Sequence, residues 1–165
     1  MASNTLQEKF LGQLPFVYFS EKQFVDGQAK MAAMATDPTL KAGIEKHREE
    51  TKQHVMTLEN VFLALNHKPE ESKCPICLGL LTSSETAMKD AGNDAIRDVS
   101  IGGSAMLIEN YEIAAYKGLI GQAQAMGRQD VVALLQQNLQ QELNTAQQLE
   151  QSAPMLNQKA ASVAA

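Results

Sequence analysis

The sequence predicts an all-α fold, a bundle of four long helices arranged as two antiparallel hairpins. Its composition favours helices, because Ala, Leu, Gln, Glu and Met dominate, aromatic residues make up only 5%, and there is no Trp. Apolar residues recur at helical spacing through four long segments, and the long alternation typical of strands is missing. With 165 residues, the chain suits one domain with a real core.

The first hairpin consists of two predicted helices separated by a clear turn signal. The first helix covers about residues 5–36, and Pro15 predicts a kink or a restart within it. Asp37 and Pro38 form a typical helix start, because Asp caps free N–H groups and Pro fits the first helical position. The second helix then runs to about Asn66.

A less regular segment, residues 66–93, follows the first hairpin. Several prolines and glycines divide it, which predicts one or two short helices at about residues 75–81 and 84–91. The segment is long enough to carry the chain from one end of a bundle to the other. We therefore expect short extra helices in the crossover between the second and third long helices.

The second hairpin consists of two predicted helices, at about residues 94–126 and 130–151, with Gly127 as a left-handed cap between them. A proline follows the second of these helices, and the last residues of the chain are small and unpatterned. We therefore expect a bundle domain over residues 1–152 and a flexible tail over residues 153–165.

Several acidic residues occupy positions where the helical pattern places the core. Glu112 interrupts the apolar stripe of the third long helix, and Glu109 lies one turn earlier on nearly the same face. A charged group on a core stripe is costly unless it is paired or bound to a metal. The other long helices carry further polar groups on or beside their inward stripes: Glu21, Glu50, His54 and Glu142.

These side chains are predicted to meet near the middle of the bundle. Glu112 and Glu142 are equally far along the chain from Gly127, so they lie at the same height in antiparallel helices. Bare carboxylates at one place would repel each other and lose hydration, whereas two divalent or trivalent cations would reverse the sign of that energy. Carboxylate and imidazole donors suit iron, manganese or zinc. The pattern therefore predicts a site for two metal ions.

Motifs from the predicted helices and the crossover also resemble those of a known family. They are Ser20-Glu21-Lys22-Gln23, His47-Arg48-Glu49-Glu50-Thr51, Glu109-Asn110-Tyr111-Glu112-Ile113-Ala114-Ala115-Tyr116, and Cys74 followed by Gly79-Leu80. Together they resemble the YciE/YciF family of ferritin-like bacterial stress proteins, and the pair of glutamates in the third motif is also similar to a helix motif of rubrerythrins. The resemblance covers about residues 4–150. It implies a ferritin-like four-helix bundle, a homodimer and a role in the stress response.

The resemblance further implies a set of metal ligands: Glu21, Glu50, His54, Glu109, Glu112 and Glu142. His54 stands four residues after Glu50, whereas related ferritin-like sites have a histidine three residues after the glutamate. The implied cofactor is two iron ions, with manganese or zinc as alternatives.

The sequence departs from the family's pattern at three positions. Family members typically carry His at the position of Asn110, Glu at the position of Gln141 and an acid at the position of Ala146. These differences leave open a site that binds metal weakly, binds a single ion or is vestigial.

Two functions of different classes follow from these observations. The first is a ferritin-like di-metal carboxylate protein that reacts with a small oxidant, oxygen or peroxide, as a ferroxidase or a peroxide scavenger. The alternative is a non-enzymatic structural or stress protein, a helical dimer with a weak or vestigial metal site. Metal retention and the rate of iron oxidation distinguish the two.

Charge and hydropathy argue against other kinds of partner. The net charge is −5 and no run of basic residues occurs, so a nucleic-acid surface is not expected. No apolar run reaches the length of about 18 residues that a membrane span needs, and the N-terminus lacks the regions of a signal peptide. We therefore expect a cytoplasmic protein. There, Cys74 and Cys77 are expected to be reduced. They are either buried thiols without a role or a pair with a redox role.

Overall fold

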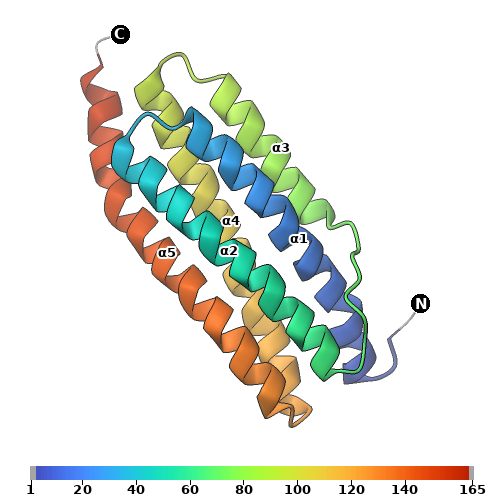
Figure 1. Ribbon diagram of the computed structural model, residues 1–165. Helices are drawn as coiled ribbons and strands as arrows, with labels where there is room; N and C mark the ends of the chain where they lie inside the picture. The colour runs from blue at the N-terminus through green and yellow to red at the C-terminus, as the bar shows by residue number, and fades with distance from the viewer. Residues whose placement is uncertain (1–2, 164–165) are drawn as a thin grey trace.

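The computed structural model describes residues 3–163, which form five helices and no strand. The helices are α1 Leu6–Met34, α2 Pro38–Ala64, α3 Pro75–Lys89, α4 Asp94–Ala125 and α5 Gln129–Ser162. Figure 1 shows them side by side, with the two ends of the chain at opposite ends of the bundle. None of these helices combines the length and the apolar character needed to cross a membrane. The predicted all-α fold is confirmed.

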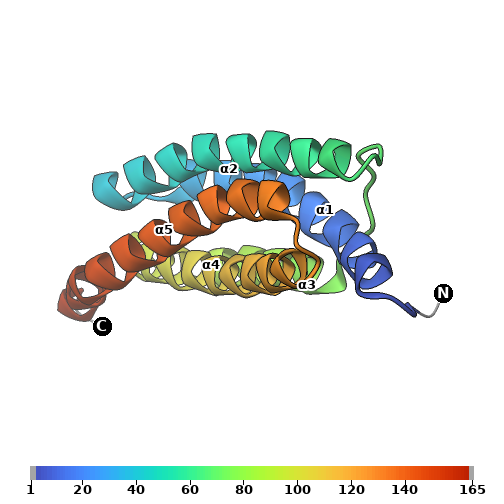
Figure 2. The same cartoon turned by 90° about the horizontal axis from the view of Figure 1, so that it is seen from below.

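The bundle consists of two antiparallel hairpins, α1–α2 and α4–α5. The two hairpins pack on each other through two pairs of helices, α1 with α4 and α2 with α5. The additional helix α3 lies outside this group of four, against α1 and α4 (Figure 1). Figure 2 shows α1 and α2 in one layer and α3 and α4 in the other. The four long helices therefore enclose a common interior.

Local signals set the helix starts where the sequence predicts them. Thr5 and Glu8 form a capping box at the start of α1, in which each side chain accepts a hydrogen bond from the other's backbone N–H, both at 3.1 Å. The carboxylate of Asp37 accepts hydrogen bonds from two N–H groups of the first turn of α2. Gly127, with φ 70°, turns the chain from α4 into α5.

Pro15 lies inside α1 without restarting the helix. A proline in a helix interior costs about 3 kcal/mol, because it removes a hydrogen bond and crowds the preceding turn. Burial of Phe10, Leu14 and Val17 on both sides of it offsets this cost. Of the kink or restart predicted at Pro15, the restart is therefore wrong.

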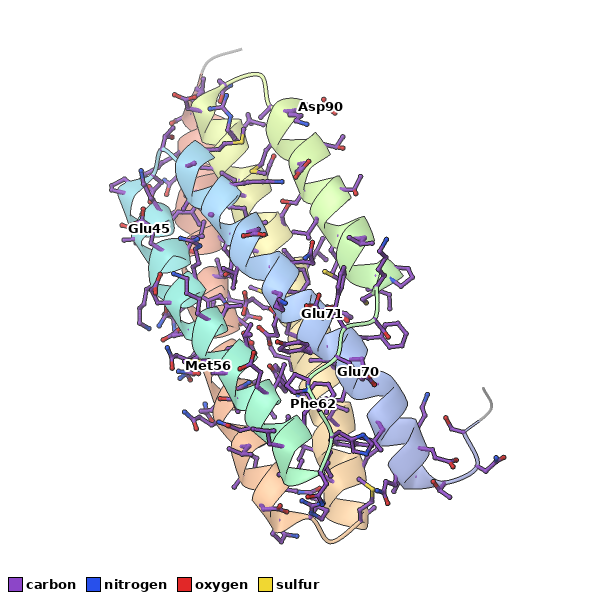
Figure 3. All side chains as sticks on the ribbon, turned by 45° about the vertical axis from the view of Figure 1, so that its right-hand side comes forward. Glu45, Met56, Phe62, Glu70, Glu71 and Asp90 are labelled. Carbon is purple, nitrogen blue, oxygen red and sulfur yellow. The ribbon has the colours of Figure 1, made fainter. Side chains whose placement is uncertain are left out.

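The crossover contains one helix rather than two, because α3 continues without a break through residues 82 and 83. Its N-terminus is preceded by an extended loop that runs along α1, and Figure 3 labels Glu70 and Glu71 on this loop. The backbone N–H of Ser72 donates to the carbonyl of Pro15 at 3.2 Å. The loop thus fixes α3 on the outer face of the α1–α4 pair.

The last helix continues to Ser162, through Pro154 and beyond the predicted end at residue 151. Two tertiary contacts explain the difference. Leu156 is buried in an apolar cluster, where it approaches the backbone of Gly102. Lys159 forms an ion pair with Asp37, the cap of α2. Residues 153–162, expected as a flexible tail, are therefore helical, and residues 164–165 lie outside the described part of the chain.

The buried side chains form two apolar clusters at different heights in the bundle. The cluster nearer the α4–α5 turn includes Phe10, Leu14, Leu58, Tyr116, Leu119 and Leu135. The other cluster includes Phe24, Met31, Leu40, Ile44, Ile101, Ile108 and Leu156. Between them along α1, α2, α4 and α5 lie buried polar and charged side chains.

Candidate metal centre

Each of the four long helices contributes a buried charged or titratable side chain to the middle of the bundle. The helical period places Glu109 and Glu112 one turn apart on α4, and His47 and His54 two turns apart on α2. Glu21 on α1 and Glu142 on α5 complete the set. All its members are at most 4% exposed: Glu21, His47, His54, Glu109, Glu112 and Glu142.

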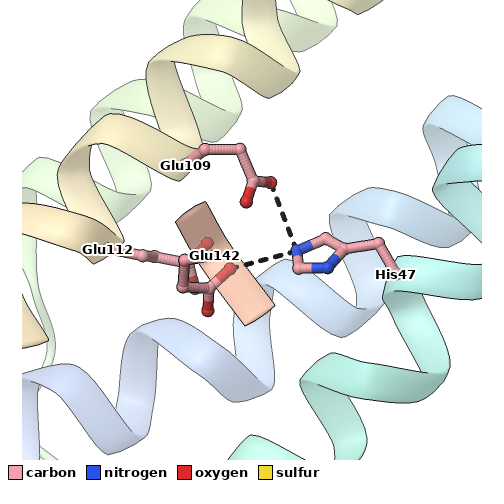
Figure 4. A group of neighbouring side chains, drawn as sticks. All are labelled: His47, Glu109, Glu112 and Glu142. Carbon is pink, nitrogen blue, oxygen red and sulfur yellow. Dashed lines mark ion pairs between the residues drawn. The ribbon is translucent and has the colours of Figure 1, made fainter. Parts of the chain in front are cut away.

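The first group of potential ligand atoms comes from His47, Glu109, Glu112 and Glu142. One atom from each lies within 4.8 Å of all the others. The Nε2 atom of His47 is 3.2 Å from Glu109 Oε1 and 3.3 Å from Glu142 Oε2. Figure 4 shows the three carboxylates facing the edge of the His47 ring from α4 and α5. One cation between them would contact three carboxylates and an imidazole.

The second group comes from Glu21, His54 and Glu142. The Nδ1 atom of His54 is 2.9 Å from Glu142 Oε1 and 3.5 Å from Glu21 Oε2. Glu142 therefore belongs to both groups, with one oxygen toward each histidine. A cation held by either group would therefore contact Glu142.

The ligand atoms of this cluster lack hydrogen-bond partners among the described residues. Both oxygens of Glu112 and Glu142, one oxygen each of Glu21 and Glu109, and the inward nitrogens of the two histidines are buried without one. The nitrogen–oxygen contacts are short enough for ion pairs but lack the alignment of hydrogen bonds. Buried polar atoms normally have partners, because leaving one unpaired costs about 1–3 kcal/mol. The donor set therefore fits metal ions, which would bind at least one of these atoms on each residue.

The outward nitrogen of each histidine has its own partner. His54 Nε2 is 2.8 Å from Gln141 Oε1, an acceptor, so Nε2 carries the proton and leaves Nδ1 free toward the cluster. His47 Nδ1 is 3.0 Å from Thr145 Oγ1 and 3.3 Å from Glu50 Oε2, which favours the proton on Nδ1 and leaves Nε2 free. These partners orient both rings so that the inward nitrogen, once it gives up its proton, presents a lone pair to the cluster.

A further hydrogen-bonded chain holds the carboxylate of Glu21. The hydroxyl of Tyr116 donates to Glu21 Oε1, and Asn138 Nδ2 donates to the Tyr116 oxygen at 2.9 Å. Burial and the neighbouring carboxylates of Glu21 and Glu142 raise the pKa of Tyr116 well above its usual value, so the phenol keeps its proton. The second oxygen of Glu21 therefore remains available on the side of His54.

Without a cation, this cluster holds protons tightly. Burial and the repulsion of neighbouring carboxylates raise the pKa of Glu112 well above its usual value, and burial raises that of Glu142 to about 8. Burial alone would lower the pKa of the histidines, but Glu109 and Glu50 raise that of His47 to about 10. Glu21 and Glu142 likewise raise the pKa of His54 to about 11. The centre thus attracts positive charge, whether protons or metal ions.

The predicted ligands are largely brought together by the fold. Glu21, His54, Glu109, Glu112 and Glu142 all belong to the two groups. Glu50 belongs to neither.

Glu50 lies at the edge of the cluster, and its side chain is 22% exposed. It contacts Lys46 at 3.0 Å and the outward nitrogen of His47 at 3.3 Å. Its contact to His47 lowers its pKa to about 2. In this arrangement Glu50 is a partner of His47 rather than a member of either ligand group.

His47 is the residue that the sequence-based ligand set omits. The signal for it was available, because His47 stands on the same buried stripe of α2 as His54.

The three residues that depart from the family's pattern can also be located in the structure. Asn110 is exposed and donates to the carbonyl of Met106, Gln141 holds His54, and Ala146 is buried.

Comparisons with known proteins agree with this architecture. The chain matches the family described as "Domain of unknown function (DUF892)" over residues 5–162. It is 28% identical to Protein YciF of Escherichia coli (strain K12) over 146 residues, which are 88% of each chain. The crystal structure of the E. coli stress protein YciF has a TM-score of 0.90 at 26% identity and covers 95% of this chain and 99% of that one.

Two further solved structures extend the comparison. YcfI of Rhodopseudomonas palustris, described as a proposed structural protein, has a TM-score of 0.88 at 31% identity and covers 91% of this chain and 98% of its own. Symerythrin from Cyanophora paradoxa, reduced with dithionite, has a TM-score of 0.69 at 14% identity, with 94% and 87% covered. The last likeness concerns the fold alone and confirms the ferritin-like bundle. The chain therefore belongs to the DUF892 family, and its resemblance to the YciE/YciF proteins is confirmed.

Proposed function

We propose that this protein binds two metal ions between its four long helices, and that the natural ions are iron. The observation that supports this proposal is the set of buried carboxylate and imidazole atoms that face one another without hydrogen-bond partners. His47, Glu109 and Glu112 would hold one ion, Glu21 and His54 the other, and Glu142 both. The same mixture of oxygen and nitrogen donors would also accept manganese or zinc.

The proposed activity is that of a ferroxidase or a peroxide scavenger. When bound, ferrous iron in such a site supplies electrons to dioxygen or hydrogen peroxide. The protein's own contribution is a buried, preformed set of ligands and a route to it. A cavity of about 440 Å³ reaches His47 and Glu109, and its walls include Ile44, Ile108 and Leu149. A small uncharged oxidant fits such an apolar route.

Metal content after loading with ferrous iron under anaerobic conditions tests the proposal. We expect two ions per chain in the wild type and loss of at least one in Glu112→Gln, which removes a charged ligand while keeping the side chain's size. Glu45→Gln is the matched control, because Glu45 is exposed on α2 (Figure 3). Equal metal content in all three proteins would contradict the proposed site.

The alternative function is a non-enzymatic structural protein of the stress response with a weak or vestigial site. The description of YcfI and the small Ala146 beside the centre favour it. Under this alternative, the wild type retains no metal after dialysis and does not accelerate iron oxidation. Oxygen consumption by iron-loaded protein, compared with Glu112→Gln and Glu45→Gln, distinguishes an active centre from a merely occupied one.

We also propose a cytoplasmic homodimer. The resemblance to the YciE/YciF family, which implies a homodimer, is what supports this proposal. Light scattering should give twice the mass of the chain. A monomer mass at every protein concentration would contradict this assignment.

A further inference from the structure

Two cysteines begin the crossover helix α3, which lies against α1 and α4 (Figure 1). Cys74 is the N-cap of this helix, Pro75 takes its first position, and Cys77 lies on its first turn. Both thiols are free and buried. The metal centre uses neither of them, so their arrangement calls for a separate explanation.

The surroundings of Cys74 favour its thiolate. Its sulfur accepts a hydrogen bond from the backbone N–H of Cys77 at 3.5 Å, and the hydroxyl of Tyr111 lies 3.2 Å away. A neutral thiol is a poor acceptor, whereas a thiolate at a helix N-terminus interacts favourably with the free N–H groups and the helix dipole. Although burial alone would raise it, these contacts lower the pKa of Cys74.

Tyr111 is placed to donate its single proton to this sulfur. Its hydroxyl also lies 3.2 Å from Ser20 Oγ, but the Ser20 hydroxyl donates to the carbonyl of Phe16 at 2.8 Å. Both neighbours of Tyr111 are therefore acceptors, and a negatively charged sulfur is the stronger one.

Cys77 has the opposite character. It is completely buried, and its sulfur lies 3.9 Å from the carbonyl oxygen of Ser20, toward which the S–H group donates. Burial raises the pKa of Cys77 to about 11, so this residue stays a thiol. One cysteine is thus a potential nucleophile and the other a protonated neighbour on the same helical turn.

Cys74 also lies close beneath the surface, although only 4% of the residue is exposed. Cys74 is flanked in the chain by exposed residues, Lys73 on one side and Pro75 and Ile76 on the other. A rotation of the Cys77 side chain would bring its sulfur to that of Cys74, because Cys74 Sγ is already 3.5 Å from the Cys77 nitrogen.

We propose that Cys74 and Cys77 form a reversible dithiol–disulfide pair that is oxidised by hydrogen peroxide. The Cys74 thiolate attacks one peroxide oxygen, the O–O bond breaks, and the leaving hydroxide takes up a proton to become water. This leaves a sulfenic acid on Cys74. The Cys77 sulfur then attacks the Cys74 sulfur, the S–O bond breaks, and a second water leaves with the Cys77 proton. Two electrons pass from the thiols to peroxide, and a small dithiol restores the reduced pair.

The cysteine pair lies next to the metal centre, but its proposed chemistry does not depend on that centre. Ser20 and Tyr111, which contact the thiols, directly precede Glu21 and Glu112 in the chain. Oxidation of the cysteines therefore takes place beside two proposed ligands from different helices. The chemistry itself needs no metal, so it can be tested separately.

The test uses metal-free wild-type protein treated with hydrogen peroxide and then analysed by intact mass and thiol alkylation. We expect loss of two hydrogens, protection of both thiols from alkylation, and full recovery with dithiothreitol. Two free thiols, a disulfide between chains, or a sulfinic acid on Cys74 in folded wild type would overturn the proposal.

Three variants test the assigned roles, each with its helix content checked by circular dichroism. Cys77→Ser should stop at a sulfenic acid that dimedone traps, and Cys74→Ser should leave Cys77 unoxidised. Tyr111→Phe should slow Cys74 oxidation about threefold for each unit of pKa increase, because higher nucleophilicity partly offsets the tenfold loss of thiolate. Oxidation of Cys77 in Cys74→Ser at the wild-type rate would overturn the roles.

Discussion

At the scale of single residues, Gln141 decides which nitrogen of His54 faces the proposed metal. Its side-chain oxygen lies 2.8 Å from His54 Nε2 and fixes the ring from outside the cluster. We expect Gln141→Met, which keeps the size but removes the acceptor, to weaken binding of one ion about 10- to 100-fold. Gln140→Met is the control, because Gln140 is exposed and its side chain bonds to Asn144 rather than to the cluster. Equal affinities in both variants, measured by titration calorimetry, would argue against this role.

Protons and metal ions compete for the same atoms of the centre. At neutral pH, His47 and His54 hold protons, since the neighbouring carboxylates raise their pKa values to about 10 and 11 although burial alone would lower them. Metal binding must displace these protons, so metal affinity should rise about tenfold per pH unit for each proton released. Calorimetry in buffers of different ionisation enthalpy counts the protons. An affinity that is constant between about pH 6 and pH 8 would contradict this coupling.

The sequence predicted most of the side chains that the fold groups together, but it did not indicate His47. The inward positions of Glu21, Glu112 and Glu142 follow from helical periodicity, and the fold confirms that they are buried together. The choice between His47 and Glu50 does not follow from periodicity, because residues three apart share one face of a helix. The rotation of α2 against α4 and α5 turns His47 inward and leaves Glu50 at the edge.

At the scale of elements, the end of α5 shows how tertiary contacts override a local signal. Pro154 predicts a helix end, but Leu156 packs in the core and Lys159 pairs with the cap of α2. These partners are far away in the sequence, so no local pattern could reveal them. The same limitation applies to Pro15 in α1, where buried neighbours on both sides maintain the helix.

Truncation of Leu156 tests whether this final segment belongs to the folded unit. Because the side chain is 3% exposed and touches the small Gly102, we expect Leu156→Ala to lower the free energy of unfolding by about 2–4 kcal/mol. Leu143→Ala on the same helix should cost less, since Leu143 is 37% exposed. Urea denaturation gives both values. Equal stability of the two variants would indicate that the segment is a loose extension.

At the scale of the whole molecule, the centre divides the core and makes stability depend on pH. In metal-free protein the folded state binds more protons than the unfolded state, because the pKa of Glu142 rises from 4.5 to about 8 and that of His47 from 6.5 to about 10. Stability should therefore fall as the pH rises through this range. Unfolding curves recorded between about pH 5 and pH 9 measure this change in the free energy of unfolding. An increase in stability with rising pH would contradict the prediction.

Replacing one proposed ligand, Glu112, separates the stability that the metal-free centre loses from the stability that bound metal adds. Glu112 has no hydrogen-bond partner for either oxygen, and its pKa is raised by burial and by Glu142, Glu21 and Glu109. A glutamine there needs no proton and carries no charge, so metal-free Glu112→Gln should be more stable than the wild type near pH 8, by a smaller margin near about pH 5. Added metal should then stabilise the wild type and not the variant. A variant that is less stable at both pH values without metal would show that the carboxylate supports the fold by itself. The predicted reversal instead identifies a bundle whose interior is built for a bound cation, at a cost in stability when the cation is removed.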